Sequence, residues 1–238
     1  QRIGHGKLPI ISYLKSIVHP FNCQAIRKEL RAVQKLGRTA DNRHILLLDD
    51  GKNTAVMDEI GRLREMTFRS IGEGTGQSKD IDVYDAYYRH LLLWDDDKLE
   101  IVGAYRLGEI WRWKNQDTKA LYSSTLFNFQ PTMEPYVAKG LELGRSFVQP
   151  QYLGMRSLDY LWQGIGAYLA AHQQVQYLFG PVSLSSSLPK SARDMVAHFY
   201  LTHRLILQPL NILHNIRHQK IHLQSLELSK LYYLKEIE

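Results

Sequence analysis

The chain has 238 residues, of which 44% are hydrophobic, 11% aromatic and 23% charged. This composition can build a sizeable core, and it excludes a disordered tail, a collagen-like repeat and a disulfide-stapled miniprotein. The single cysteine, Cys23, cannot form an internal disulfide, and no apolar stretch approaches the ~20 residues that cross a bilayer. The sequence opens on Gln1 without a secretion signal, so we expect part of a longer polypeptide that lies in the cytoplasm.

The net charge of +6 is unevenly spread along the chain. Residues 1–43 hold nine Lys and Arg against two acids, residues 44–100 hold seven against thirteen, and residues 101–238 hold fourteen against nine. Basic ends around an acidic middle are typical of a protein that binds an acidic partner, and solvated surface charge is the alternative interpretation. The basic residues are not interleaved with aromatic residues, so we expect no nucleic acid among the partners.

Hydrophobic spacing and turn residues predict the elements of the first half of the chain. Residues 1–20 are interpreted as loops, Asn22 and Thr54 stand where helix N-caps are expected, and Gly37 stands where a helix ends. In chain order, we predict a helix at 22–36, a strand at 44–48, a turn at 49–51, a helix at 54–69, a flexible loop at 72–79, and hairpin strands at 90–94 and 100–108.

The second half of the chain predicts a strand–helix–strand unit. In chain order, we predict a strand at 141–148, a helix at 153–172, a strand at 176–184, a helix at 190–204, and strand-like alternation at 221–228. Leu158, Leu161, Ile165 and Tyr168 should form the inward face of the long helix. The order predicts an α/β fold with an antiparallel front and a strand–helix–strand unit at the back.

Residues 142–156 carry the densest chemical pattern of the sequence. On an unbroken strand, Glu142 and Ser146 would share one face and Arg145 would lie on the other. A carboxylate inside a cleft can have its pKa raised by desolvation and then act as a general base. Gly154 stands where the strand gives way to a helix, and free backbone N–H groups at such a turn favour a pyrophosphate or phosphopantetheine.

Together with the strand order, these features resemble the GNAT superfamily of N-acyltransferases. The stretch Val148-x-Pro150-x-Tyr152-x-Gly154 is similar to the turn that opens the donor-binding helix of that superfamily. Further blocks look like the subgroup of ornithine-lipid N-acyltransferases, long-chain N-acyl amino acid synthases and, more distantly, acyl-homoserine-lactone synthases. These blocks are Arg64-x-x-x-Phe68, Asp82-x-x-Asp85, Val102-Gly103-x-Tyr105-Arg106-Leu107 and Glu142-Leu143-Gly144-Arg145-Ser146, and Phe179-Gly180-Pro181-Val182-Ser183 fits the branch labelled putative hemolysin.

The resemblance covers about residues 43–205 and implies a GNAT-like mixed sheet flanked by helices. It implies an acyltransferase domain at 43–205, a linker or the tail of a preceding domain at 1–42, and a C-terminal extension of the same domain at 206–238. Superfamily members usually have several glycines in the donor loop, whereas Met155 and Arg156 follow Gly154 here. This departure is compatible with acyl carrier protein as the donor in place of coenzyme A.

The implied activity is transfer of a fatty acyl group from an acyl-carrier-protein or acyl-CoA thioester to the amine of an amino acid such as ornithine, in aminolipid synthesis. No tightly bound cofactor is expected, and a peripheral position on the inner face of the membrane is a further expectation. The expected catalytic group is Glu142 as general base, with Arg145, Arg106, Asp82 and Asp85 shaping the acceptor pocket. Donor binding is assigned to Phe147, Val148, Gln151, Gly154, Met155 and Arg156, and substrate binding to Arg64, Phe68, Tyr105, Ser146 and Trp162. Arg43, Arg156, Lys190 and Arg193 are expected to meet the acidic carrier protein.

Several alternatives remain open from the sequence. The buried Arg and Asp residues could form a purely structural network, and Trp162 on the long helix fits the core better than a site. The chain could instead transfer a small group from acetyl-CoA, or be a catalytically silent, hemolysin-like module that binds lipid. The spacing of His214 and His218 lacks the neighbouring Glu of a zincin, so no metal is expected. The serines lack the Gly-x-Ser-x-Gly elbow of serine hydrolases.

Overall fold

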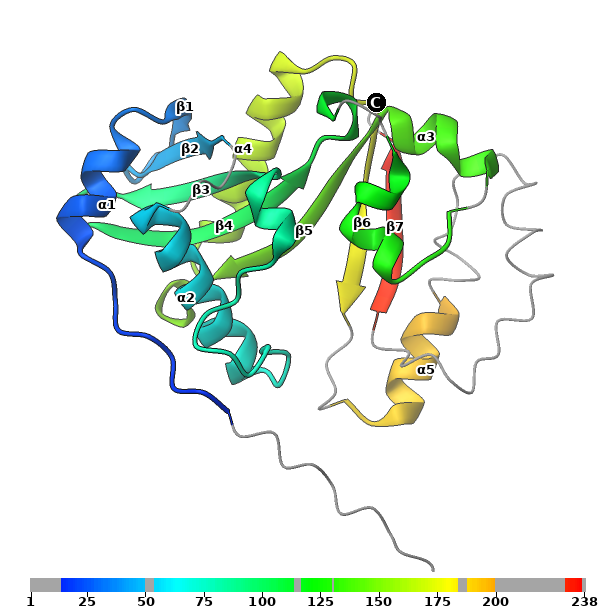
Figure 1. Cartoon of the computed structure of the whole chain (residues 1–238), viewed down its shortest axis with the longest axis horizontal. Helices are drawn as coiled ribbons and strands as arrows, with labels where there is room; N and C mark the ends of the chain where they lie inside the picture. Colours follow the sequence, from blue (N-terminus) through cyan, green and yellow to red (C-terminus); the bar gives the residue numbers. More distant parts are fainter. Residues whose placement is uncertain are drawn as a thin grey trace, which may run out of the picture.

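A computed structural model describes residues 14–49, 54–113, 117–129, 131–183, 188–199 and 230–236. Its centre is a seven-stranded sheet in which the strands lie side by side in chain order (Figure 1). The strands are β1 (Gln34–Arg38), β2 (His44–Leu48), β3 (Arg89–Asp95), β4 (Glu100–Gly108), β5 (Gly140–Val148), β6 (Tyr177–Ser183) and β7 (Lys230–Glu236). All neighbouring strands are antiparallel except β5 and β6, which are parallel.

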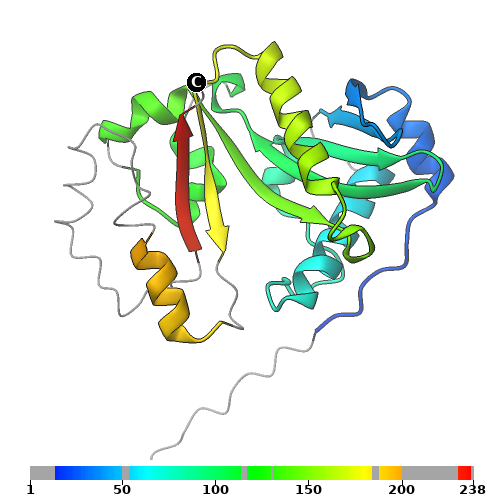
Figure 2. The same cartoon turned by 180° about the vertical axis from the view of Figure 1, so that it is seen from behind.

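Helices cover both faces of this sheet (Figures 1 and 2). The helices are α1 (Cys23–Leu30), α2 (Ala55–Ser70), α3 (Glu134–Ala138), α4 (Ser157–Ala171) and α5 (Lys190–Phe199). Short 3-10 turns stand at η1 (Val83–Ala86), η2 (Ile110–Arg112), η3 (Thr118–Ala120), η4 (Tyr122–Thr125), η5 (Pro131–Met133) and η6 (Pro150–Tyr152). Ile60 of α2 packs with Leu46 and Leu92 on one face, whereas Leu161 of α4 packs with Leu91 on the other.

The sheet forks between β5 and β6. The two strands pair only where Gly140–Glu142 meets Tyr177–Phe179, and beyond this point they diverge (Figure 1). Gly180 lies at the fork, where a Cβ atom would collide with the carbonyl oxygen of Leu143. A residue with a side chain would therefore push the strands apart at this point. The remainder of β5 has one edge that β6 does not cover.

The predicted fold class is confirmed. A mixed sheet lies between helices, its first five strands are antiparallel, and α4 joins the parallel pair β5 and β6. The hairpin turn between β3 and β4 is also confirmed, with the Lys98 N–H donating to Asp95 at 3.0 Å. Thr54 caps α2 through the N–H of Met57, as the sequence indicated.

Two predicted helices are wrong at a boundary, and one predicted inward-facing residue is wrong. The first helix ends at Leu30, and residues 34–38, including Gly37, form strand β1 because pairing with β2 outweighs their helical spacing. The long helix begins at Ser157 instead of residue 153, since the chain first makes the turn at η6. Leu158 was expected to face inward, but it is 49% exposed because it lies on the solvent side of α4.

Several predictions concern residues outside the described part of the chain. These residues are 1–13, most of the turn at 49–51, the end of the helix predicted at 190–204, and the alternation at 221–228. Strand β7, which pairs with β6, was not predicted. The helix α1 and the strand β1 lie within the segment interpreted as a linker, and they join the core and the sheet. The domain boundaries at residues 43 and 206 stay predictions.

None of the described helices combines the length and the apolarity needed to traverse a bilayer.

Candidate active site

A buried ion pair between α2 and η1 anchors the site. Two guanidinium nitrogens of Arg64 donate to the two carboxylate oxygens of Asp85 at 2.9 and 2.7 Å, and both side chains are buried. His90 Nε2 lies 3.0 Å from the same carboxylate. Burial alone would raise the pKa of Asp85, but hydrogen bonds from His90 and Arg64 hold it far below its usual range. Asp85 is therefore ionised, and it fixes η1 against α2 and β3.

Arg106 on β4 extends this network toward an aromatic cluster. Its Nη1 donates to Asp82 at 2.6 Å and to Asp85 at 3.2 Å. The guanidinium carbon lies 5.1 Å from the ring centre of Tyr88 and 5.3 Å from that of Tyr122, both within the reach of a cation–π contact. Arg106 is 1% exposed, and its Nε and Nη2 have no hydrogen-bond partner among the described residues.

Arg145 lies at a break in the strand geometry of β5. Its φ of 46° is in the left-handed region, which costs a non-glycine residue of order 1–3 kcal/mol and is common at active sites. The pairing of β4 with β5 shifts register at the same place. The guanidinium of Arg145 lies 3.3 Å from Asp80 and 3.7 Å from Asp82, and the side chain is 21% exposed.

This bulge makes the predicted strand alternation wrong. Arg145 lies on the α2 side of the sheet, 6.0 Å from the ring of Phe68, and 5.5 Å from the ring of Tyr122. The backbone N–H of Tyr122 donates to Glu142, so Glu142 and Arg145 belong to one cluster. Ser146 instead bonds Tyr105, which packs on the α4 side. The extra residue in β5 therefore separates Glu142 from Ser146.

Glu142 is 1% exposed and has donors on both carboxylate oxygens. Oε1 accepts from the N–H of Ser123 at 2.7 Å and from the Ser123 hydroxyl, and Oε2 accepts from the hydroxyl of Tyr88 and the N–H of Tyr122 at 3.2 Å. A carboxylate has about four acceptor positions, so these bonds satisfy it. Burial and the Glu142 charge raise the pKa of Tyr88 far above its ordinary value, so Tyr88 stays protonated and donates.

The structure brings five of the predicted residues together. Glu142, Arg145, Arg106, Asp82 and Asp85 form one cluster, and Arg64 and Phe68 border it.

The other predicted substrate residues lie elsewhere. Tyr105 and Trp162 contact each other on the α4 side, with ring centres 6.3 Å apart. Phe68 packs on the α2 side, so the structure does not bring these three predicted substrate-binding residues together. Trp162 was expected in the core, but it is 43% exposed.

Sequence reasoning missed four members of the cluster. These are Asp80, Tyr88, Tyr122 and Ser123. Burial raises the pKa of Asp80 despite the charges of Arg64 and Arg145, and its Oδ2 has no hydrogen bond among the described residues. The tyrosines next to the Asp82-x-x-Asp85 block were the available signal. Ser123 lies in a segment without hydrophobic periodicity, so the sequence gave no signal for it.

The predicted donor turn has an open helix start. Gly154 has a φ of 77°, with no atom within 4 Å of a Cβ built there. The N-cap of α4, Arg156, makes no side-chain capping bond, and the buried hydroxyl of Ser157 has no partner within the described ranges. Met155 and Arg156 are exposed, whereas Gln151 donates to Glu100 at 2.9 Å. Uncapped N–H groups at this position suit an anionic donor group.

Two residues that were predicted to contact the acyl donor or the carrier protein have buried side chains. The Phe147 side chain is buried in the cluster under α1 and α2, so only its backbone is available to a donor. Arg43 is buried and pairs with Asp41 at 3.0 Å and with Asp95 at 3.2 Å, so it is not free to meet a carrier protein.

Residues 63–163 match the family model of the acetyltransferase (GNAT) domain. This stretch is similar to GNAT domains. The matched stretch holds Arg64, η1, the strands β3 to β5 and the first half of α4, and therefore the whole cluster around Glu142. The resemblance inferred from the sequence motifs is confirmed at this level.

Curated relatives extend the similarity beyond the GNAT domain. The glycine Nα-acyltransferase of Bacteroides thetaiotaomicron is 35% identical over 204 residues, which cover 80% of this chain and 60% of that protein. The L-ornithine Nα-acyltransferase of Brucella abortus is 33% identical over 148 residues, which cover 55% of this chain and 50% of that protein. The chain therefore spans less than two thirds of the length of these relatives. The predicted likeness to ornithine N-acyltransferases is confirmed.

Among solved structures, the CoA-dependent acyl-homoserine lactone synthase BjaI is similar at a TM-score of 0.46. The two sequences are 14% identical, and the match covers 83% of this chain and 84% of that chain.

Proposed function

We propose that this chain transfers a fatty acyl group from a thioester to the amine of an amino acid. The observation that carries the proposal is the buried Glu142 carboxylate, which lies in a GNAT domain beside Arg106 and Arg145, on the strand that leaves β6. The names of the relatives, which specify glycine and ornithine, support the same class of reaction.

In the proposed reaction, the ammonium group of the amino acid first gives one proton to Glu142, and the resulting amine nitrogen attacks the thioester carbonyl carbon. The C–N bond forms, the C–S bond breaks, the leaving thiolate takes up the second proton that the nitrogen gives up, and Glu142 returns the first proton to solvent. Glu142 is enclosed, so it receives the first proton through a hydroxyl that already donates to it. As the amine proton moves to the hydroxyl of Tyr88 or Ser123, the hydroxyl proton moves to Glu142.

The open edge of β5 supplies a donor for the developing oxyanion. The N–H of Gln149 donates to the carbonyl of Val102 on β4 at 2.9 Å. Successive residues of a strand point their N–H groups to opposite edges, so the N–H of Val148 points to the edge that β6 has left. A single donor of this kind can contribute about 2.7–4 kcal/mol to stabilising the transition state.

Arg145 is the group that would hold the carboxylate of the amino acid. Its guanidinium is partly exposed, Asp80 and Asp82 fix it, and its Nε is without a hydrogen bond among the described residues. A planar guanidinium fits a carboxylate with two parallel hydrogen bonds. This position would orient the α-amine next to the cluster around Glu142.

The start of α4 is the proposed site for the anionic part of the donor, either the arm of acyl carrier protein or coenzyme A. The helix start without a side-chain cap supports it, as does the Ser157 hydroxyl, which has no hydrogen bond to any residue that the structure describes. The exposed Arg156 beside them suits an acidic carrier protein. The proposal includes a role in aminolipid synthesis at the inner face of the membrane.

Mass spectrometry of the reaction products tests the proposed function. The chain is incubated with palmitoyl-carrier protein, palmitoyl-CoA or acetyl-CoA, and with glycine or ornithine. We expect N-palmitoyl glycine or N-palmitoyl ornithine from at least one palmitoyl donor. Acetylated product alone would replace the lipid assignment with a small-group acetyltransferase. If the folded protein gives no product with any acyl donor, the proposed activity is wrong, and the alternative of a non-catalytic, lipid-binding module is favoured.

A further inference from the structure

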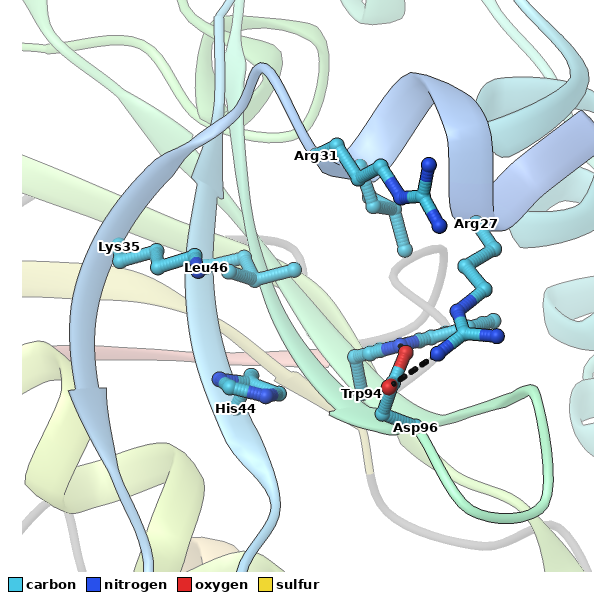
Figure 3. A pocket seen from close by; sticks show the side chains of 8 residues that line it. Arg27, Arg31, Lys35, His44, Leu46, Trp94 and Asp96 are labelled. Carbon is cyan, nitrogen blue, oxygen red and sulfur yellow. Dashed lines mark hydrogen bonds and ion pairs between the residues drawn. The ribbon is translucent and has the colours of Figure 1, made fainter.

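A small pocket lies between α1 and the strands β1, β2 and β3 (Figure 3). These strands form the end of the sheet that is opposite to β6 and β7 (Figure 1). Its volume is about 130 Å³. Its lining consists of Arg27, Leu30, Arg31, Lys35, His44, Leu46, Trp94 and Asp96. Pockets for drug-sized ligands occupy ~300–1,000 Å³, so this one suits a single small group and excludes a nucleotide or an acyl chain.

Basic side chains from three elements converge on this pocket. Arg27 of α1 and Arg31, the C-cap residue of that helix, are one helical turn apart, and the side chains of both line the pocket (Figure 3). Lys35 comes from β1 and His44 from β2. Like charges at this helical spacing repel each other, and a single carboxylate, Asp96, lies among them, so the pocket keeps a net positive charge that an anion would offset.

The single carboxylate of the lining is already engaged. Asp96 accepts from Arg27 at 2.8 Å and from the indole nitrogen of Trp94 at 3.1 Å, and these bonds lower its pKa. Neither Arg31 nor Lys35 forms an ion pair with a residue that the structure describes. Two cationic side chains therefore remain available to a ligand.

The pKa of His44 reflects the positive charge around the pocket. Burial and the charges of Arg38 and Lys35 lower its pKa, so its imidazole is mainly neutral at pH 7. A neutral imidazole offers one N–H donor, and a bound dianion would favour its protonated form. The buried ring of Trp94 forms an apolar wall, which strengthens a charge-assisted bond compared with open water.

We propose that this pocket is a binding site for a phosphate group, held by Arg31 and Lys35 with a hydrogen bond from His44. Its recognition chemistry is that of a phosphate dianion, which a soluble phosphate monoester or the headgroup of phosphatidic acid supplies. The site is separate from the cluster around Glu142, and it does not depend on the proposed acyl transfer.

The test follows the His44 imidazole by NMR during titration with inorganic phosphate at constant ionic strength. We expect a saturable shift of the His44 resonance and a rise of its pKa in the bound state. The R31A/K35A variant removes two exposed side chains without ion pairs, and it should weaken binding by roughly tenfold or more, since hydrogen bonds between charged groups are the strong ones. The K119A/K139A variant removes the same charge from exposed positions outside the pocket and should bind as the wild type does.

A shift that chloride reproduces, or one that survives in R31A/K35A, would overturn the proposal. A second arm identifies the source of the phosphate group by sedimentation with phosphatidylcholine vesicles that contain phosphatidic acid. Binding to these vesicles that R31A/K35A loses would assign the lipid headgroup. Saturable phosphate binding without vesicle binding would assign a soluble phosphate monoester.

Discussion

The Glu142→Gln variant is expected to lower kcat/KM for acyl transfer by about 10²–10⁴-fold, the usual contribution of a general base. The amide that replaces the carboxylate cannot take up a proton at neutral pH. Its NH₂ group would also face the donors of Ser123 or Tyr88, which now bond a carboxylate oxygen. The rate is measured with the thioester and amino acid that give product, alongside the midpoint of thermal unfolding. An unchanged rate in a folded Glu142→Gln variant would remove Glu142 from the proton path.

Glu109→Gln is the matched control for this prediction. Glu109 is buried to a similar extent, accepts from the hydroxyl of Tyr168 and pairs with Arg112 at 2.8 Å. It lies outside the cluster of Arg106 and Arg145, so the same chemical change should alter stability without the loss of rate. Equal losses of rate in both variants would indicate that the effect of Glu142→Gln comes from disturbed folding.

The Asp85→Asn variant is expected to destabilise the fold by about 3–5 kcal/mol, because it removes the carboxylate that the buried Arg64 bonds through two nitrogens and leaves only Asp80, 3.9 Å away, as its charged partner. At roughly 2–4 °C per kcal/mol for a chain of this size, the midpoint of thermal unfolding should fall by roughly 6–20 °C. Calorimetry measures this shift. The control is Asp58→Asn, whose ion pair with Lys79 is partly exposed and should contribute only about 0–1 kcal/mol.

The ionised Asp85 also predicts how the stability of the fold changes as the pH falls. Its pKa in the folded protein is lower than in the unfolded chain, where an aspartate has a pKa of about 3.9. The stability that Asp85 contributes is therefore present above about pH 4 and is lost as the pH falls further. Denaturant unfolding at pH 7 and pH 3 should show a smaller difference in Asp85→Asn than in the wild type. The same difference in both proteins would contradict the assignment.

The strands β2 to β6 were predictable because they combine short apolar runs with turn residues. The hairpin strands β3 and β4 follow this pattern, and their bounds agree closely with the prediction. Strand β1 did not follow it, since Gln34–Arg38 is mostly exposed and polar and becomes a strand only by pairing with β2. The spacing of hydrophobic residues within one segment does not show that pairing with another strand stabilises it.

The charged members of the site were predictable as residue types, but their geometry was not. Motif resemblance pointed to Glu142, Arg145, Arg106, Asp82 and Asp85, which the structure brings together. The position of Arg145 depends on a left-handed residue at a register shift, which strand periodicity does not predict. The donors that enclose Glu142 come from irregular segments whose positions depend on tertiary packing.

The pH dependence of kcat/KM in wild type and Glu142→Gln tests most directly whether Glu142 takes up the amine proton. Without that acceptor, only amino acid that is already deprotonated in solution can react. We therefore predict that the wild type greatly exceeds the variant near pH 7, and that the ratio of the two rates shrinks as the pH approaches the pKa of the amine. A ratio that stays constant over this range would mean that Glu142 only supports the fold, and it would contradict the proposed proton path.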